Sequence, residues 1–205
     1  SSFQNLGITT VTIPSTVTSM GNTAFFSNLN LTSAIINSTV IGERSFESSP
    51  LLSTVTLSNN LLSIGNEAFK TTGLTSITIP NTVTSLGTSS FEDTSLSSIV
   101  FDSVSQITDI PQECFKDSWE NTRIVTTLTL PEAVQTFGSQ SFQQAGIQTL
   151  AIPNTTTVID QYAFYGQRYT TFAGTDPALD WTDAIRRGLD TLTFDATSVV
   201  TTIGN

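Results

Sequence analysis

The chain has 205 residues, a formal net charge of −10, no histidine and only 12% charged residues. Nucleic acids and anionic membranes are disfavoured as partners, because both require a basic surface. Without histidine there is no Ser-His-Asp triad, no ordinary general base near neutral pH and no typical zinc site, so we expect neither enzyme activity nor a cofactor. No apolar stretch approaches the ~18 residues of a membrane-spanning helix, and we expect no membrane insertion of this segment.

A motif that closes on a phenylalanine recurs at nearly regular spacing along the chain. Its cleanest copy, residues 74–91, reads LTSITIPNTVTSLGTSSF. One copy is too short to bury its own apolar side chains, whereas stacked copies bury a continuous core. The closing phenylalanines are Phe3, Phe25, Phe46, Phe69, Phe91, Phe115, Phe142 and Phe164.

Each copy is predicted to begin with a β-strand, because apolar residues alternate with polar ones before a proline or polar turn. We therefore predict about nine repeats and nine parallel strands, one per repeat, in a single solenoid over residues 1–205. Phe69 and Phe91 are predicted to be buried. The expected central inward residues are Val11, Ala34, Val55, Ile77, Ile99, Leu128, Leu150, Phe172 and Leu192. Those explicitly predicted to be buried are Val11, Val55, Ile77, Leu128, Leu150 and Leu192.

Both ends of the chain cut a repeat open. Residues 1–3 match the end of a copy, and residues 202–205 match the middle of one. We therefore expect the chain to be a fragment of a longer array. Because solenoids normally need polar terminal caps, we expect neighbouring sequence, another chain or an atypical repeat to cover the open ends. If another copy of this chain covers them, the protein self-associates.

Two segments depart from the repeat. An insertion at residues 116–123 lengthens the interval between Phe115 and Phe142 and carries Trp119. Residues 176–188 read DPALDWTDAIRRG. They predict one α-helix over 177–187, since an aspartate suits the N-cap, a proline suits the first turn and a glycine suits the stop.

The motif resembles the unit of the BspA-like class of leucine-rich repeats, LxxIxIPxxVxxIGxxAFxxC, which is about 23 residues long. Residues 74–91 match it, and so do VTIPSTVTSMGNTAF and LLSTVTLSNNLLSIGNEAF, although the family's trailing Cys is missing. The resemblance implies a right-handed solenoid with one parallel β-sheet on its concave side and short turns or 3-10 segments on its convex side. It also implies a secreted or cell-surface protein that adheres to host matrix, to other cells or to other copies of such proteins, and it implies no shared catalytic residues.

The outward strand positions form the candidate binding surface. The position before each central residue carries Ser or Thr in every predicted strand, and the position after it forms an uncharged row. Three explanations remain open: the β-propensity of Thr on an exposed sheet, a face that binds protein or glycan, and an array that orders water. The predicted binding residues are Thr12, Thr56, Thr78, Val100, Thr129 and Ala151 on the concave face, and Trp119. For Trp119, a local anchor for the insertion is the alternative.

No metal site is predicted. Carboxylates are dense at residues 109–120 and 176–190, and Ca²⁺ prefers such oxygen ligands, but neither group has an EF-hand spacing. Cys114 takes the place of the Ala or Ser that precedes other closing phenylalanines, so we predict a buried core thiol. The sequons at Asn30, Asn37 and Asn154 are candidate glycosylation sites in a eukaryotic secretory route.

We therefore predict an extracellular or cell-surface recognition module, an adhesin, that binds protein or glycan through an extended uncharged face. The alternative is a structural spacer or filament subunit, assembled by end-to-end stacking of repeats. A β-helix polysaccharide lyase would need Asp with Lys or Arg clustered on one sheet face, and the exposed positions carry no such cluster.

Overall fold

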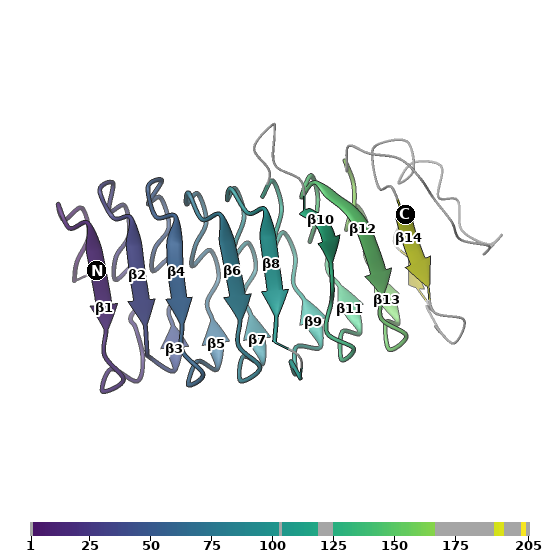
Figure 1. Cartoon of the computed structure of the whole chain (residues 1–205), viewed down its shortest axis with the longest axis horizontal. Helices are drawn as coiled ribbons and strands as arrows, with labels where there is room; N and C mark the ends of the chain where they lie inside the picture. Colours follow the sequence, from purple (N-terminus) through teal and green to yellow (C-terminus); the bar gives the residue numbers. More distant parts are fainter. Residues whose placement is uncertain (1, 103, 119–124, 167–190, 195–201, 204–205) are drawn as a thin grey trace.

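The computed structural model describes residues 2–102, 104–118, 125–166, 191–194 and 202–203. In these residues the chain winds into a solenoid, with long strands on one side and short strands behind them (Figure 1). One rung consists of a long strand, a short strand and a closing loop around the phenylalanine of the repeat. The described residues contain no helix, and accordingly none that could cross a membrane.

Eight long strands form the first face of the solenoid, and parallel pairing keeps their central residues aligned, as with Val11, Ala34 and Val55. The ladder of paired residues has breaks between β4 and β6 and between β8 and β10, but these strands remain in contact. The long strands are β1 (Thr10–Ile13), β2 (Ser33–Ile36), β4 (Thr54–Leu57), β6 (Ser76–Ile79), β8 (Ser98–Phe101), β10 (Val125–Leu128), β12 (Ile147–Ile152) and β14 (Thr191–Phe194).

A second parallel sheet corrects the prediction of one strand per repeat with only turns or 3-10 segments opposite. The second apolar step of each repeat also alternates, so that Leu86 is buried while Ser85 is exposed, and neighbouring copies pair across the rungs. The short strands are β3 (Val40–Ile41), β5 (Ser63–Ile64), β7 (Ser85–Leu86), β9 (Asp109–Ile110), β11 (Thr136–Phe137), β13 (Val158–Ile159) and β15 (Thr202–Ile203).

The strand order also corrects the expected sequence of rungs near the C-terminal end. β12 pairs directly with β14, which aligns Leu150 with Leu192, and β13 pairs directly with β15. The strand predicted around Phe172 therefore does not lie between them in the sheet, and Phe172 is outside the described residues. The helix predicted over 177–187 is also outside them.

The closing phenylalanines form one continuous stack through the core. Neighbouring rings from Phe3 to Phe164 have centroids 5.1–5.7 Å apart and planes within 2–11° of parallel. The stack arises because each rung places the same residue one strand spacing further along the solenoid. Phe69 and Phe91 are fully buried, as predicted.

The inward strand residues are only partly as predicted. Ile77, Leu128 and Leu150 are buried, whereas Val11 and Val55 are half-buried at the margin of the core. Val11 lies in β1, which has a paired neighbour on one side only. Val55 lies in β4, beside the break in the ladder before β6, but Ile77 on the other side of that break is buried, so the break alone does not account for the exposure of Val55. For Leu192 the structure describes the strand but not the burial of the side chain.

Each closing loop contains left-handed residues two positions before and two after its phenylalanine. In the Phe69 loop these are Glu67 (φ 53°) and Thr71 (φ 55°). The N–H groups of Glu67, Phe69 and Thr71 each donate to a carbonyl of the next loop, at 2.9 Å. These hydrogen bonds across rungs explain why non-glycine residues hold a backbone conformation that normally costs free energy.

A buried polar residue follows each of several closing phenylalanines by three positions, where the repeat unit that the sequence resembles has its trailing Cys. The Thr72 hydroxyl donates to the Phe69 carbonyl at 2.8 Å, and the Asn28 amide donates to the carbonyls of both Phe25 and Phe3, at 2.7 and 2.8 Å. A buried carbonyl without a hydrogen-bond partner is costly. Thr72 and Asn28 therefore stabilise their loops by satisfying these carbonyls.

Candidate binding face and the charged loop edge

The outward side of the long strands, which we call the long-sheet face, is exposed as predicted. The row after each central residue is solvent-accessible along the described rungs, including the apolar Ile35 and Val100 at 43% and 48% exposure. Alternation along each strand produces this row, because Ile77 points into the core while Ser76 and Thr78 point outward. The exposed members of the row are Thr12, Ile35, Thr56, Thr78, Val100, Thr129 and Ala151.

Hydroxyl groups on the long-sheet face fall into two classes. At the start of the strands, Thr32 Oγ1 donates to the Thr9 carbonyl at 3.0 Å and Ser97 Oγ donates to the Thr75 carbonyl at 3.1 Å, so these groups tie one rung to the next. Among the described residues, the hydroxyls of Thr78 and other members of the exposed row have no such protein partner. Those groups can donate to a ligand and accept from it.

The row of hydroxyls before the central residues is aligned by the strand register. Thr10, Ser33 and Thr54 are paired across β1, β2 and β4, and Ser76 is paired with Ser98. At the C-terminal end, Thr149 is paired directly with Thr191. Thr171, which was predicted to belong to this row, lies outside the described residues.

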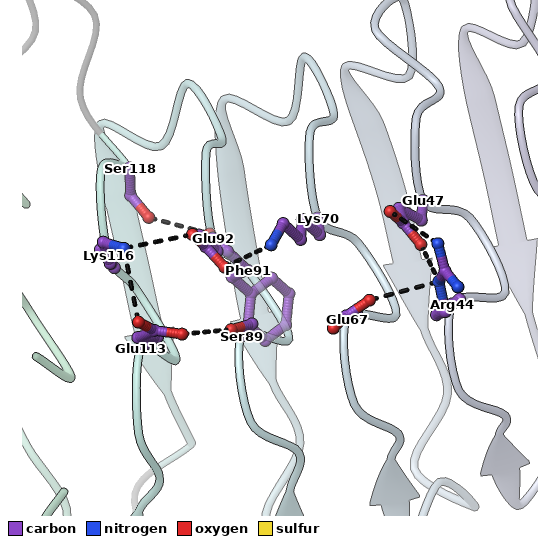
Figure 2. Close-up of polar contacts among 10 residues, drawn as sticks. All are labelled: Arg44, Glu47, Glu67, Lys70, Ser89, Phe91, Glu92, Glu113, Lys116 and Ser118. Carbon is purple, nitrogen blue, oxygen red and sulfur yellow. Dashed lines mark hydrogen bonds and ion pairs between the residues drawn. The ribbon is translucent and has the colours of Figure 1, made fainter. Parts of the chain in front are cut away.

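Charged side chains gather instead at the closing loops, as Figure 2 shows. Every described cation takes part: Arg44 contacts Glu47 and Glu67, and Lys70 and Lys116 both contact Glu92, at 2.8 and 3.5 Å. Lys116 also contacts Glu113 at 3.4 Å, and Glu113 in turn accepts a hydrogen bond from Ser89 at 3.1 Å. We call this network the charged loop edge.

The charged loop edge is largely self-neutralised. Burial raises the pKa of the Glu92 carboxyl, but its hydrogen bond with Lys70 and the charges of Lys70 and Lys116 outweigh that effect and hold the pKa below its ordinary value. The Arg44 guanidinium has a raised pKa, chiefly because it donates to Glu47. Burial raises the pKa of Asp117, which borders the network.

Sequence reasoning missed this network. Glu92 lies about one repeat after Lys70 and about one repeat before Lys116, so the three meet only once the loops are stacked. The available signal was the charge alternation of Glu47, Lys70, Glu92 and Lys116 directly after four successive closing phenylalanines.

The remaining predicted site residues differ in their exposure to solvent and in their hydrogen bonds. Trp119 lies outside the described residues. Asn30 and Asn154 are exposed, and Asn30 lines a shallow hollow beside Leu6 and Leu29. Asn37 is half-buried, and its amide donates to the Ile13 carbonyl at 3.0 Å, which makes it a poorer candidate for glycosylation than the other two sequons.

Cys114 is fully buried, as predicted, and its sulfur lies 3.3 Å from Ser90 Oγ. Burial raises the pKa of this thiol to about 12, so it is protonated at neutral pH. In the described part of the chain, no group of three or more Asp, Glu or Cys side chains is placed to hold a metal ion. Of the carboxylates at residues 109–120, Glu113 instead pairs with Lys116.

Stacked parallel strands, an in-register core and closing loops define the class of this protein as a leucine-rich-repeat solenoid. The sequence profile of the BspA type leucine-rich repeat region, in six copies, matches residues 1–121 and 39–171. The chain belongs to this family.

Two solved structures of bacterial proteins share the fold. A leucine-rich repeat protein from Bacteroides ovatus has 21% sequence identity and a TM-score of 0.56, and the match covers 96% of this chain and 55% of that one. A leucine-rich repeat protein from Eubacterium ventriosum has 17% identity and a TM-score of 0.50, with 96% and 60% covered. The chain thus spans little more than half the length of these relatives. No curated protein matches it.

Proposed function

We propose that this chain is an extracellular or cell-surface recognition module that binds a protein or glycan through the long-sheet face. The observation that carries the proposal is the exposed row through Thr56, Thr78 and Thr129, in which no position is charged. The family of BspA-type repeats supports the location, and the exposed apolar and hydroxyl groups support the binding role.

The physical chemistry of the face favours a neutral partner. Docking onto charged side chains requires their desolvation, which is costly, whereas the cores of protein interfaces are depleted in charge. Exposed Ile35 and Val100 offer apolar area, and free threonine hydroxyls offer hydrogen bonds. Seven steps between eight strands give a face roughly 34 Å long at the usual strand spacing, which suits an extended partner.

The test introduces charge at the centre of the face. The double substitution Thr78→Arg and Thr129→Arg should abolish binding to immobilised matrix proteins or neutral oligosaccharides, as measured by surface plasmon resonance. The melting temperature should change little, because exposed substitutions usually shift stability by less than about 0.5 kcal/mol. The matched control, Thr84→Arg with Gln135→Arg, adds the same charge beside the short strands and should retain binding.

Full affinity in the Thr78→Arg, Thr129→Arg variant would reject the long-sheet face as the site. If Trp119→Ala alone abolished binding, the site would move to the insertion. Failure of the wild-type chain to bind either class of partner would contradict the proposed recognition role.

A further inference from the structure

The exposed row of the long-sheet face is symmetric about its own centre. Over the first six long strands, its sequence of hydroxyl and apolar side chains is the same in either direction: Thr12, Ile35, Thr56, Thr78, Val100 and Thr129. The two apolar members, Ile35 and Val100, are both exposed and lie one rung outside β4 and β6. The row before the central residues carries only Ser or Thr. A surface with this symmetry is complementary to a second copy of itself.

A two-fold axis parallel to the strands, midway between β4 and β6, uses this symmetry. It places β4 of one copy opposite β6 of the other, and β2 opposite β8. Ile35 of each copy then lies opposite Val100 of the other, and Thr56 lies opposite Thr78. The strands of both copies run in the same direction, which is the aligned arrangement of packed sheets, about 10 Å apart.

The geometry of the rungs keeps this face close to flat. Parallel pairing joins neighbouring rungs both in the long strands, which stand in a row in Figure 1, and in the short strands behind them. Both sides therefore advance by about 4.7–4.9 Å per rung, and the planes of successive stacked phenylalanine rings differ by only 2–11°. A solenoid curves through the rotation from each rung to the next. Because that rotation is small here, two such faces can touch along their length.

Charge favours this face for contact between copies. The chain has a net charge of −10, so two copies repel each other, and their ion pairs gather at the charged loop edge (Figure 2). The six positions of the symmetric row carry no charge. Copies that meet through this row therefore bury no ionised side chain, whose desolvation would be costly.

The area of the face is sufficient for a weak dimer. Six rungs span about 29 Å, and a long strand with the residue before it spans about 17 Å. The contact therefore covers about 500 Å² per copy, or roughly 1,000 Å² in total, which is the lower limit for a specific interface.

We propose that the long-sheet face pairs with the long-sheet face of a second copy of this chain, in a two-fold dimer in which Ile35 packs against Val100. The inference rests on the proposed recognition role of this face and names its partner. A sugar fits less well, because the six positions carry no aromatic ring for stacking and no carboxamide that donates and accepts together. If the copies are displayed on two cells, the dimer holds those cells together.

The test is sedimentation velocity of the purified chain from low to high micromolar concentration. The wild type should show a monomer–dimer equilibrium. Ile35→Arg and Val100→Glu should each raise the dissociation constant of the dimer at least about tenfold, because each places a charge against an apolar side chain twice in the dimer. The chain with both substitutions should dimerise again, since residue 35 of each copy then forms an ion pair with residue 100 of the other. An equimolar mixture of the two single variants should also recover the dimer.

Leu62→Arg is the matched control, because Leu62 is a similarly exposed apolar residue (49%) beside the short strands, and it should dimerise as the wild type does. A wild type that stays monomeric, or a dimer that neither Ile35→Arg nor Val100→Glu weakens, would overturn the inference. A monomeric double variant would also overturn it, since only the proposed two-fold pairing brings the arginine against the glutamate. A monomer that binds a matrix protein or a neutral sugar through Thr78 and Thr129 would overturn this inference alone and leave the proposed function intact.

Discussion

The phenylalanine stack makes a quantitative prediction for Phe69→Ala. The Phe69 ring is fully buried and lies between Phe46 and Phe91, with both centroid distances 5.4 Å. Truncation of a buried phenylalanine to alanine costs about 3–5 kcal/mol, and each aromatic pair contributes about 0.5–1.5 kcal/mol beyond its buried area. We therefore expect the free energy of unfolding to fall by about 4 kcal/mol or more.

Phe3→Ala is the matched control, because Phe3 has the same position in the repeat but is 48% exposed. Its ring has a single stacked neighbour, Phe25, at 5.2 Å. We expect a loss of about 1–2 kcal/mol, roughly half of the burial contribution. Phe69→Leu, which keeps apolar volume and removes the stacking, should fall between the two.

The assay is guanidinium chloride unfolding, followed by far-UV circular dichroism and analysed by linear extrapolation. Because each rung contacts only its neighbours, Phe69→Ala should also broaden the transition as the two halves of the array uncouple. If Phe69→Ala cost no more than Phe3→Ala, the stack would not be a main source of stability, and the reasoning would be refuted.

Three further predictions concern single side chains. Glu92→Gln should reduce the pH dependence of stability: the folded pKa of Glu92 lies below its ordinary value of 4.5, so its contribution is present above the unfolded pKa and is lost as the pH falls through the folded pKa. Melting temperatures from pH 7 to pH 3 should therefore drop less in the variant than in the wild type, and an equal drop would contradict the role of Lys70 and Lys116. Thr71→Gly should raise the free energy of unfolding by about 0.5–1 kcal/mol, since it relieves a β-branched residue at φ 55°; a lower denaturation midpoint would show that Thr71 is not strained. Cys114 should resist alkylation by iodoacetamide at pH 8 in the folded chain and react after unfolding, because the thiol is buried and its pKa is raised to about 12; reaction in the native state would disprove this burial.

Much of the fold follows from the period of the sequence. The closing phenylalanines recur once in every copy of the motif, and once one turn of chain equals one repeat, equal positions must stack. The burial of Phe69 and Phe91, the thiol of Cys114 in a small-residue position and the exposure of Thr78 all follow from that rule. These features depend only on the alternation of side chains along a strand and on the repetition of the motif from rung to rung. Both patterns can be seen in the sequence of one or two repeats.

Other features required the rungs to be placed against one another. The second sheet depends on the pairing of two-residue segments from neighbouring rungs. Two residues are too short a pattern to predict a strand from the sequence. The direct pairing of β12 with β14 depends on which rung follows which in space, and a repeat count along the chain does not contain that order. The ion pairs of Glu92 depend on residues about one repeat apart in the chain becoming neighbours. The sequence by itself therefore determined which positions of a rung are buried and which are exposed. The tertiary structure decided which side chains of different rungs are in contact, because such contacts join residues that are distant in the chain and become neighbours only when the loops stack.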